Sequence, residues 1–312
     1  MIDARLHLAL DGGGLELPAE GTIAVFQPPR DSDLPGLDKD RVQIIHGFKP
    51  DYDAWAARGY DVVRTIKDRY AACIVCLPRA KAEARAVIAA ACEVCDGIVV
   101  IDGQKTDGAD SVLREMRDRV TVQGPISKAH GKMFWISEPA AEFFTDWRQG
   151  PELTEGGFWT APGVFSADGV DLASALLVDA LPEKLGAEVA DLGAGWGFLS
   201  AHALTRPAIK NLYVVEAGHL ALECARRNVT DDRASFHWED ATSWEPPHRL
   251  DGVIMNPPFH IGRAAEPQIG QAFVATAARI LSPQGKLWMV ANRHLPYEAE
   301  LKTRFAHVEE IG

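Results

Sequence analysis

The chain has 312 residues, of which 47% are hydrophobic and 24% charged, and its formal net charge is −12 at pH 7. This composition argues against a disordered chain, the length allows two domains of medium size, and the charge argues against broad, nonspecific attraction to nucleic acid or an anionic membrane. No run approaches the roughly 18 apolar residues of a membrane span, and the N-terminus lacks a cationic start leading into an apolar core, so we expect a cytoplasmic protein without membrane contact.

Apolar runs in the first half predict strands at residues 22–27, 42–48, 73–78 and 97–102, with helical patterns between some of them. This alternation is typical of a parallel sheet covered by helices on both faces. "LDGGGLEL" at residues 10–17 is followed by no helical pattern, so we interpret it as a hairpin turn. Residues 1–150 hold 19 Lys and Arg against 23 Asp and Glu, whereas the remainder holds 13 against 21. Basic groups for a polyanion are therefore expected mainly in the first half.

Four cysteines of the first half have a spacing that can hold zinc, C-x2-C-x15-C-x2-C. Cys73 and Cys76 fall on a predicted strand, where residues three apart face opposite sides and cannot easily share one ion. Cys92 and Cys95 fall on the apolar face of a predicted helix. We therefore expect no metal site and interpret these four, and the isolated Cys224, as buried structural cysteines.

Residues 147–166 are rich in glycine and proline and lack periodicity, so they predict a linker, with one domain over residues 1–155 and a second over 156–312. The second half begins with an amphipathic helix at 171–181, whose apolar side should carry Leu172, Leu176 and Leu177. Strands and helices then alternate. The predicted strands are 187–193, 211–217, 234–240, 251–256 and 285–292, with helices from about 198, at 219–228 and at 267–281. We expect residues 307–312 to begin a further strand.

The two halves contain a possible internal repeat. "CIVCLPRAKAEA…CDGIVVIDGQK" and "GVIMNPPFHIGRAAE…SPQGKLWMVANR" share the order strand, proline break, helix, glycine-containing turn and strand. The identity between them is low, and their shared order suggests a gene duplication.

The strongest chemical signal is "VADLGAGWGFLS", residues 189–200. Asp191 stands at a strand end and leads into Gly193, Gly195 and Gly197, whose lack of side chains lets a ligand lie on the backbone. The dinucleotide fingerprint would require glycine at Phe198, so a pyrophosphate-binding loop is disfavoured.

Acidic residues end the next two strands. Glu216, 25 residues after Asp191, can accept both hydrogen bonds of a ribose diol. The Asp240 carboxylate can accept from an adenine amino group while the backbone N–H of Ala241 reaches a ring nitrogen. Because open α/β sheets bind ligands at the carboxyl ends of their strands, these residues predict a nucleoside site.

With "NPPF" at residues 256–259, this pattern resembles the class I S-adenosylmethionine (AdoMet) dependent methyltransferases that methylate exocyclic or amide nitrogens. The match covers residues 160–312. "PGVFSADGVDLASALL", "NPPFH" and "MVANRHLPY" are similar, more narrowly, to the guanine-N2 methyltransferases of small-subunit ribosomal RNA. The resemblance implies two Rossmann-like methyltransferase-type α/β domains in tandem, the first degenerate and helping to hold the substrate. It implies an enzyme whose partner is ribosomal RNA or the small ribosomal subunit, and we expect a monomer.

The resemblance also implies AdoMet as the cofactor and gives roles to individual residues. The expected cofactor-binding residues are Asp191, Gly193, Ala194, Gly195, Gly197, Glu216, Asp240, Ala241 and Asn256. The expected catalytic residues are Asn256, Pro257 and Phe259. The side-chain oxygen of Asn256 and the carbonyl of Pro257 would accept the two amino hydrogens of the base, and Phe259 would stack on it. A paired base would first have to flip out of its stack.

Two alternatives remain open from the sequence. "NPPF" presents the same acceptors to any planar NH2 group, so the substrate could be a protein glutamine amide or an adenine or cytosine amine. The chain could also be a noncatalytic RNA-binding assembly factor that retains the cofactor fold.

Overall fold

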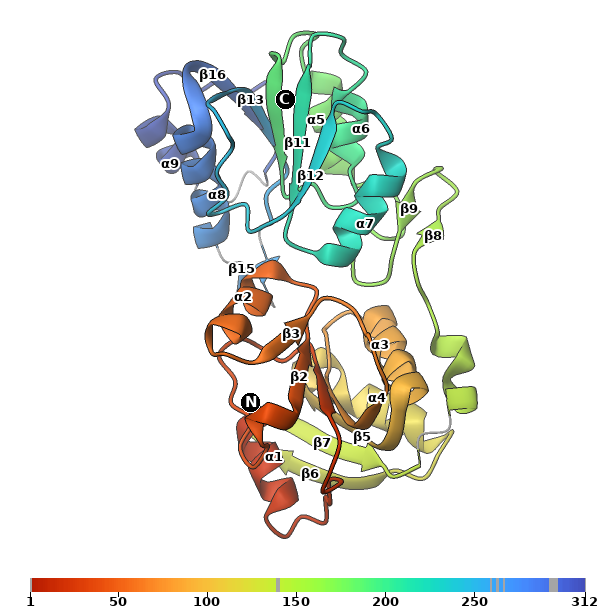
Figure 1. Ribbon diagram of the computed structural model, residues 1–312. Coiled ribbons are helices and arrows are strands. Elements are labelled where there is room, and N and C mark those ends of the chain that lie inside the picture. Colours follow the sequence, from red (N-terminus) through yellow and green to blue (C-terminus); the bar gives the residue numbers. More distant parts are fainter. Residues whose placement is uncertain are drawn as a thin grey trace. The chain divides into compact units, whose positions relative to one another are not determined.

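The computed structural model describes residues 2–138, 141–258, 260–261, 264–265, 267–291 and 297–311. The chain divides into two compact units, Met1–Gly150 (unit 1) and Pro151–Gly312 (unit 2), whereas the sequence prediction placed the boundary between residues 155 and 156. Figure 1 shows a sheet flanked by helices in each unit. None of the helices in the described part of the chain is both long and apolar enough to span a membrane.

Unit 1 is built on a seven-stranded sheet of order β3-β2-β1-β4-β5-β7-β6. The first five strands are parallel, β7 is antiparallel to β5, and β6 is antiparallel to β7. Its elements in chain order are α1 (Ile2–Leu10), β1 (Ile23–Phe26), η1 (Lys39–Arg41), β2 (Val42–Ile45), α2 (Lys49–Ala57), β3 (Asp61–Val63), β4 (Tyr70–Cys76), α3 (Lys81–Val94), β5 (Cys95–Gln104), η2 (Lys105–Asp107), α4 (Ala109–Arg117), β6 (Gln123–Lys128), β7 (Gly131–Ile136) and η3 (Ala141–Trp147).

The central strands of unit 1 are buried on both sides, because each face of the sheet packs on its own hydrophobic cluster. One cluster joins α3, α4 and η3 to the sheet, and the other joins α1 and α2. Burial of both faces explains why β1 and β4 read as nearly continuous apolar runs. The four strands predicted in this half are confirmed as β1, β2, β4 and β5.

The structure corrects one local prediction and confirms another. Residues 10–17 form no hairpin: Leu10 ends α1, residues 11–17 follow the helix, and a Cβ at Gly13 would lie 2.5 Å from the carbonyl oxygen of Leu8. All five cysteines are buried and free, as expected for structural cysteines. Cys73 packs in the α3 cluster and Cys76 in the α1 cluster, so the two side chains do occupy opposite faces of the sheet.

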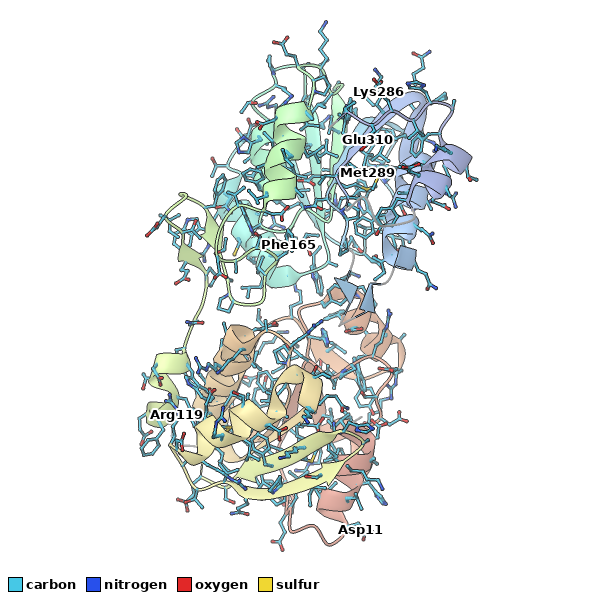
Figure 2. The ribbon with its side chains drawn as sticks, turned by 180° about the vertical axis from the view of Figure 1, so that it is seen from behind. Asp11, Arg119, Phe165, Lys286, Met289 and Glu310 are labelled. Atoms are coloured by element: carbon cyan, nitrogen blue, oxygen red, sulfur yellow. The ribbon has the colours of Figure 1, made fainter. Side chains whose placement is uncertain are left out.

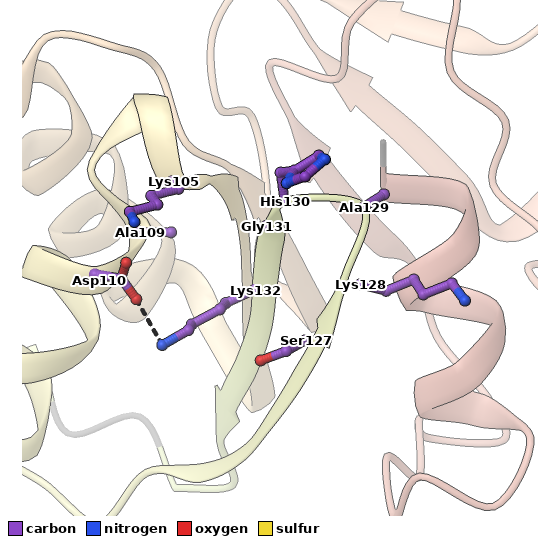
Figure 3. Close-up of a pocket in the computed structure, with 9 residues that line it drawn as sticks. All are labelled: Lys105, Ala109, Asp110, Ser127, Lys128, Ala129, His130, Gly131 and Lys132. Carbon is purple, nitrogen blue, oxygen red and sulfur yellow. Dashed lines mark ion pairs between the residues drawn. The ribbon is translucent and has the colours of Figure 1, made fainter.

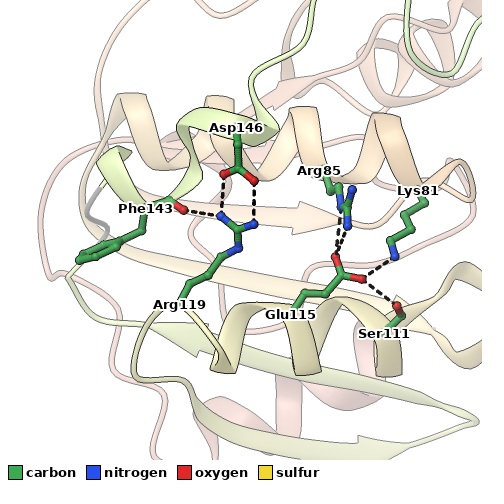
Figure 4. A network of polar contacts seen from close by, with 7 residues as sticks. All are labelled: Lys81, Arg85, Ser111, Glu115, Arg119, Phe143 and Asp146. Atoms are coloured by element: carbon green, nitrogen blue, oxygen red, sulfur yellow. Dashed lines mark hydrogen bonds and ion pairs between the residues drawn. The ribbon is translucent and has the colours of Figure 1, made fainter.

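A polar network on the α3 side of unit 1 fastens α3, α4 and η3 to one another (Figure 4). The Glu115 carboxylate of α4 accepts from Lys81 at 2.5 Å, Arg85 at 2.8 Å and Ser111 at 3.0 Å. Arg119 donates two hydrogen bonds to Asp146, at 2.6 and 2.7 Å. Burial alone would raise the pKa of Glu115, but the hydrogen bonds from Lys81, Arg85 and Ser111 outweigh it and lower the pKa to about 2.

Unit 2 is built on a five-stranded, fully parallel sheet of order β12-β11-β10-β13-β16. Helices α5, α6 and α7 pack on one face, and α8 and α9 on the other. Its elements in chain order are β8 (Glu152–Leu153), β9 (Trp159–Thr160), α5 (Leu172–Ala180), β10 (Glu188–Leu192), α6 (Phe198–Ala203), β11 (Asn211–Glu216), α7 (His219–Asn228), β12 (Ala234–Trp238), β13 (Leu250–Met255), β14 (His260–Ile261), β15 (Ala264–Ala265), α8 (Pro267–Ile280), β16 (Leu281–Met289) and α9 (Tyr297–Arg304).

The same strand order recurs in the two units. β3-β2-β1-β4-β5 of unit 1 corresponds to β12-β11-β10-β13-β16 of unit 2, and the two sequence segments predicted to be a repeat are β4-α3-β5 and β13-α8-β16. The prediction of two Rossmann-like domains in tandem is confirmed. In unit 1, β1 is followed by Gln27, Pro28 and Pro29 in place of a glycine-rich loop, which accounts for the degenerate character of its sequence.

Three predictions for unit 2 need correction. Leu177 of α5 is buried, but Leu172 and Leu176 are 82% and 67% exposed, so the apolar side of this helix is not wholly packed. The segment expected as a linker contributes to unit 2 from β8 onward, and Thr160 and Ala161 are both buried. The strand expected at residues 307–312 is absent from residues 307–311, the part that the structure describes.

Candidate active site

The glycine-rich loop joins β10 to α6 at the carboxyl edge of the sheet. Gly193, Gly195 and Gly197 have φ angles of +71°, +57° and +88°, which side-chain-bearing residues rarely adopt. A Cβ at Gly193 would lie 3.0 Å from Phe273, and one at Gly197 would lie 3.1 Å from Val229, whereas a Cβ at Gly195 would meet nothing within 4 Å. Gly195 is therefore the point of the loop at which a ligand can approach the backbone.

Glu216, the last residue of β11, fixes this loop. Its carboxylate accepts from the backbone N–H of Gly195 at 2.8 Å and of Gly218 at 2.6 Å. Burial raises the pKa of Glu216, and these backbone N–H groups oppose the rise. The structure thus brings two of the predicted site residues, Glu216 and Gly195, into direct contact.

Asp191 of β10 is fully buried beneath the loop. Its Oδ2 accepts from the Ser200 hydroxyl at 2.7 Å, while its Oδ1 is buried with no hydrogen-bond partner among the described residues. Burial, with a smaller contribution from the charge of Glu216, raises the pKa of Asp191 to about 7. An unpartnered carboxylate oxygen in such a place is an acceptor for a ligand that donates a hydrogen.

Asp240 and Ala241 follow β12, two strands away from β10. The Asp240 Oδ1 accepts from both the backbone N–H of Thr242, at 2.8 Å, and its hydroxyl, at 2.7 Å. The carbonyl of Thr242 accepts from Thr276 of α8 at 2.7 Å, which ties the turn to the neighbouring helix. Ala241 is 3% exposed. Asp240 is thereby held at the same sheet edge as Glu216 and Asp191.

Asn256 follows β13, the strand next to β10. Its side-chain nitrogen donates to Asp171 Oδ2 at 3.0 Å and to Ser174 Oγ at 2.9 Å. Asp171 is also the N-cap of α5, where the same Oδ2 accepts from the backbone N–H of Ser174 at 2.8 Å. Because a carboxylate only accepts hydrogen bonds, these contacts fix the orientation of the amide, and Asn256 Oδ1 is left buried with no partner among the described residues.

The rest of the motif is only partly described. Pro257 is buried and Pro258 exposed. Phe259 lies outside the described residues, so its stacking role stays a prediction. In the described part of the chain, no group of three or more His, Cys, Asp or Glu side chains could hold a metal ion.

Sequence reasoning missed Asp171 and Ser174 as members of this site. The signal was present as a helix N-cap pattern, an aspartate three residues before a serine at the start of a helical stretch. Their contact with Asn256 spans 85 and 82 residues and could not be read from local pattern. The preceding segment is also attached to the loop, because the indole N–H of Trp196 donates to the carbonyl of Phe165, whose side chain is 56% exposed (Figure 2).

The strand order of unit 2 and the glycine-rich loop after its central strand define a class I methyltransferase fold. The family model of the methyltransferase small domain matches residues 155–312, about half of the chain. The chain therefore belongs to the methyltransferase small domain family.

Two curated relatives and one solved structure illustrate what the chain is similar to. It is 36% identical over 155 residues to ribosomal RNA large subunit methyltransferase G of Shewanella amazonensis, covering 48% of this chain and 40% of that protein. It is 29% identical over 205 residues to ribosomal RNA small subunit methyltransferase C of Hahella chejuensis, covering 62% of this chain and 60% of that protein. The chain thus spans less than two thirds of the length of either relative.

The solved structure is a T. thermophilus 16S rRNA N2 methyltransferase, RsmC, in complex with AdoMet and guanosine. It superposes with a TM-score of 0.77 at 24% identity, covering 97% of this chain and 87% of that one. At this identity the likeness bears on the fold, and it extends over both units of the chain.

Proposed function

We propose that the chain is an AdoMet-dependent N-methyltransferase that methylates the exocyclic N2 amine of a guanine in small-subunit ribosomal RNA. The observation that carries this proposal is the Asn256 side chain: its NH2 group is held by Asp171 and Ser174, and its buried oxygen has no partner among the described residues. A buried acceptor without a donor costs stability. An incoming NH2 group would satisfy it.

The residues at the sheet edge fit AdoMet as the cofactor. The open backbone face of Gly195 leaves room for the ligand, Glu216 and Asp240 supply acceptors for ribose and adenine, and the N–H of Ala241 supplies a donor. The unpartnered Asp191 Oδ1 can accept a hydrogen from an ammonium or hydroxyl group, and AdoMet carries both. When bound, AdoMet supplies an activated methyl group on a sulfonium.

The roles of the protein groups follow from the chemistry of a purine amine, whose lone pair is delocalised into the ring. Asn256 Oδ1 and the carbonyl oxygen of Pro257 accept the two amino hydrogens, and this turns the lone pair out of conjugation and toward the methyl group. Phe259 stacks on the base and holds its plane. Asp171 and Ser174 act through Asn256 as positioning residues, because they keep its oxygen, and not its nitrogen, toward the substrate. Preorganised acceptors of this kind lower the barrier without a strong general base.

Unit 1 would assist by holding the RNA. It has the same strand order as unit 2 but lacks the glycine-rich loop after β1 and ends β2 next to His46 in place of an acid. We propose that unit 1 holds the substrate and that unit 2, which includes residues 151–155, is catalytic, in a monomer that acts in the cytoplasm. The names of the relatives, both ribosomal RNA methyltransferases, support an RNA substrate.

A second candidate substrate is large-subunit ribosomal RNA, because the relative with the higher identity is a large subunit methyltransferase. A panel of acceptors separates the candidates: small subunits, large subunits, the two naked ribosomal RNAs, and a release factor, all from cells that lack this protein. With methyl-labelled AdoMet, we expect label in small-subunit RNA. Label in large-subunit RNA would select the second candidate, and label in the release factor would select amide methylation. AdoMet binding without transfer to any acceptor would favour the noncatalytic reading.

A further inference from the structure

A surface cavity of about 340 Å³ lies in unit 1, where the β6–β7 turn meets the start of α4 (Figure 3). Its lining includes Lys105, Lys128, His130 and Lys132, the hydroxyl of Ser127, and a single carboxylate, Asp110. This concentration of basic groups contrasts with the net charge of −12 of the whole chain. A concave surface lined mainly by one sign of charge favours a ligand of the opposite sign.

The single carboxylate of the cavity does not neutralise its lysines. Asp110 Oδ1 lies 2.5 Å from Lys132 Nζ, and this ion pair neutralises the charge of Lys132. Lys105 and Lys128 form no ion pair within the described part of the chain, and both are exposed. Two lysines of the lining are therefore left without a carboxylate partner among the described residues, and Figure 3 shows their side chains on opposite sides of the β6–β7 hairpin, so that they flank the turn.

The turn that carries these groups has an unusual backbone. Ala129 and His130 have φ angles of +49° and +58° between β6 and β7. Two-residue hairpin turns of this form strongly favour Asn and Gly, since other residues are strained there by about 1 kcal/mol or more each. Strain of this kind persists where the surroundings enforce it, and it is concentrated at ligand sites.

Neighbouring residues hold the β6–β7 turn in this strained conformation. The buried Arg5 forms a bidentate ion pair with the buried Asp102, at 2.6 and 2.8 Å, and its third donor contacts the carbonyl of Lys128 at 2.9 Å. From the other side, the backbone N–H of Lys105 donates to the carbonyl of His130 at 2.9 Å. A buried ion pair thus holds the backbone of the turn in place, and this fixes the positions from which its side chains extend.

The start of α4 adds a further favourable feature. Ala109 and Asp110, the first two residues of this nine-residue helix, line the cavity, and Gly108 at the N-cap provides no side-chain cap. The first N–H groups of a helix have no intrahelical acceptor and carry partial positive charge. A small oxyanion in the cavity would lie near them.

We propose that this cavity binds a backbone phosphate of the RNA substrate and so anchors the RNA on unit 1. The inference rests on the proposed function for the existence of an RNA substrate. Lysine contacts to phosphate position a nucleic acid without reading its sequence. The base would then be selected in unit 2. The phosphate contact on unit 1 would raise the affinity for RNA and make that affinity depend on salt concentration.

The test is the double variant Lys105→Gln/Lys128→Gln, which removes two exposed charges without disturbing packing. Lys67→Gln, which removes one exposed charge of the same unit outside the cavity, is the control. Binding to naked small-subunit ribosomal RNA is measured by fluorescence anisotropy at several salt concentrations. The proposal predicts that the double variant binds on the order of tenfold more weakly at low salt, and that the slope of log affinity against log salt falls by about 0.7–0.9 for the phosphate lost. The control keeps the wild-type slope, and AdoMet affinity is unchanged in both.

The outcomes separate this proposal from the proposed function. If the wild type binds and methylates RNA but the double variant keeps its affinity and slope, the phosphate site is wrong and the enzymatic proposal stands. If the wild type binds neither naked small-subunit ribosomal RNA nor the small subunit, both are wrong. Calorimetric titration with inorganic phosphate provides a further arm: phosphate binding that the double variant loses, with RNA affinity unchanged, would assign the cavity to free phosphate and overturn its role in RNA binding.

Discussion

At the scale of single residues, the central feature is the orientation of the Asn256 amide. Truncation by Asn256→Ala removes the proposed acceptor for the substrate amine and leaves the glycine-rich loop, Glu216 and Asp240 in place. We expect turnover to fall by on the order of a hundredfold, the usual scale for one preorganised polar group, with little change in AdoMet affinity. Single-turnover methylation and equilibrium cofactor binding measure the two quantities, and unchanged turnover would refute the role of Asn256.

Asp171 permits a sharper test, because Asp171→Asn keeps the capping ability of the side chain but changes what it offers to Asn256. An amide at position 171 can donate as well as accept, so the Asn256 side chain is no longer held in one orientation. We expect kcat to fall by on the order of tenfold while the KM for AdoMet and the melting temperature stay close to wild type. Asp179→Asn, on an exposed position of the same helix, is the control. A fall in thermal stability that accounts for the whole loss of activity would show that Asp171 has only a structural role.

The buried Asp191 should make stability depend on pH. Its pKa is raised to about 7 by burial and by Glu216, above the value of about 4 for an unfolded aspartate. The folded state therefore holds a proton that the unfolded state has lost, and the free energy of unfolding declines as the pH rises from about 4 to about 7. Asp191→Asn removes this decline, so we expect its stability relative to wild type to rise by on the order of 1–3 kcal/mol between pH 5 and pH 8. Urea unfolding at the two pH values measures this change, and an identical difference at both would contradict the assignment.

At the scale of elements, most strands that are buried on both faces could be predicted from the sequence, but the equally buried β7 and the exposed edge strand β6 were missed. β1, β4, β5, β10, β11 and β13 are buried on both faces, so their apolar runs are visible in the sequence. β6, "QGPISK", is mostly exposed at the sheet edge and carries no such run. For α5 the prediction of a helix was correct, but the prediction of its buried face was not. Leu172 and Leu176 lie on a surface that the described residues of unit 2 leave uncovered. Periodicity identifies a face without showing that the face is packed.

The contacts of Glu115, which join α4 to α3, have a testable consequence at the scale of elements. The pKa of Glu115 in the folded state, about 2, is below its unfolded value of about 4.3. Its contribution to stability is therefore complete above pH 4.3 and is lost as the pH falls toward 2. We expect Glu115→Gln to lower the melting temperature at pH 7 and to have a smaller effect at pH 3. Glu20→Gln, at an exposed residue of the same unit, should change neither, and an equal loss at both pH values would show that the charge of Glu115 is unimportant.

At the scale of the whole molecule, the repeat seen in the sequence extends to the strand order of the two units. The sequence predicted which half carries the site, because the glycine loop, Glu216, Asp240 and "NPPF" all fall in unit 2. The sequence could not predict how Asn256 is oriented or that the β6–β7 turn is strained at Ala129 and His130. Those features depend on Asp171 and Arg5, which are distant in the chain and are brought into contact only by folding.

The difference between the two units predicts how many AdoMet molecules the chain binds. Unit 1 has no glycine-rich loop after β1 and no acid at the end of β2, so only unit 2 should bind AdoMet. Calorimetric titration should give one AdoMet per chain, and Asp240→Ala should weaken that single site. A second site that survives this substitution would contradict the assignment of unit 1 as a cofactor-free domain.

The most direct test of the account is the chemical identity of the methylated product. Small-subunit ribosomal RNA from cells lacking this protein is incubated with the protein and labelled AdoMet, digested to nucleosides and analysed by mass spectrometry. We expect labelled N2-methylguanosine with the wild type and on the order of a hundredfold less with Asn256→Ala. Label in methylated adenosine or cytidine, or N2-methylguanosine formed equally well by the variant, would contradict it.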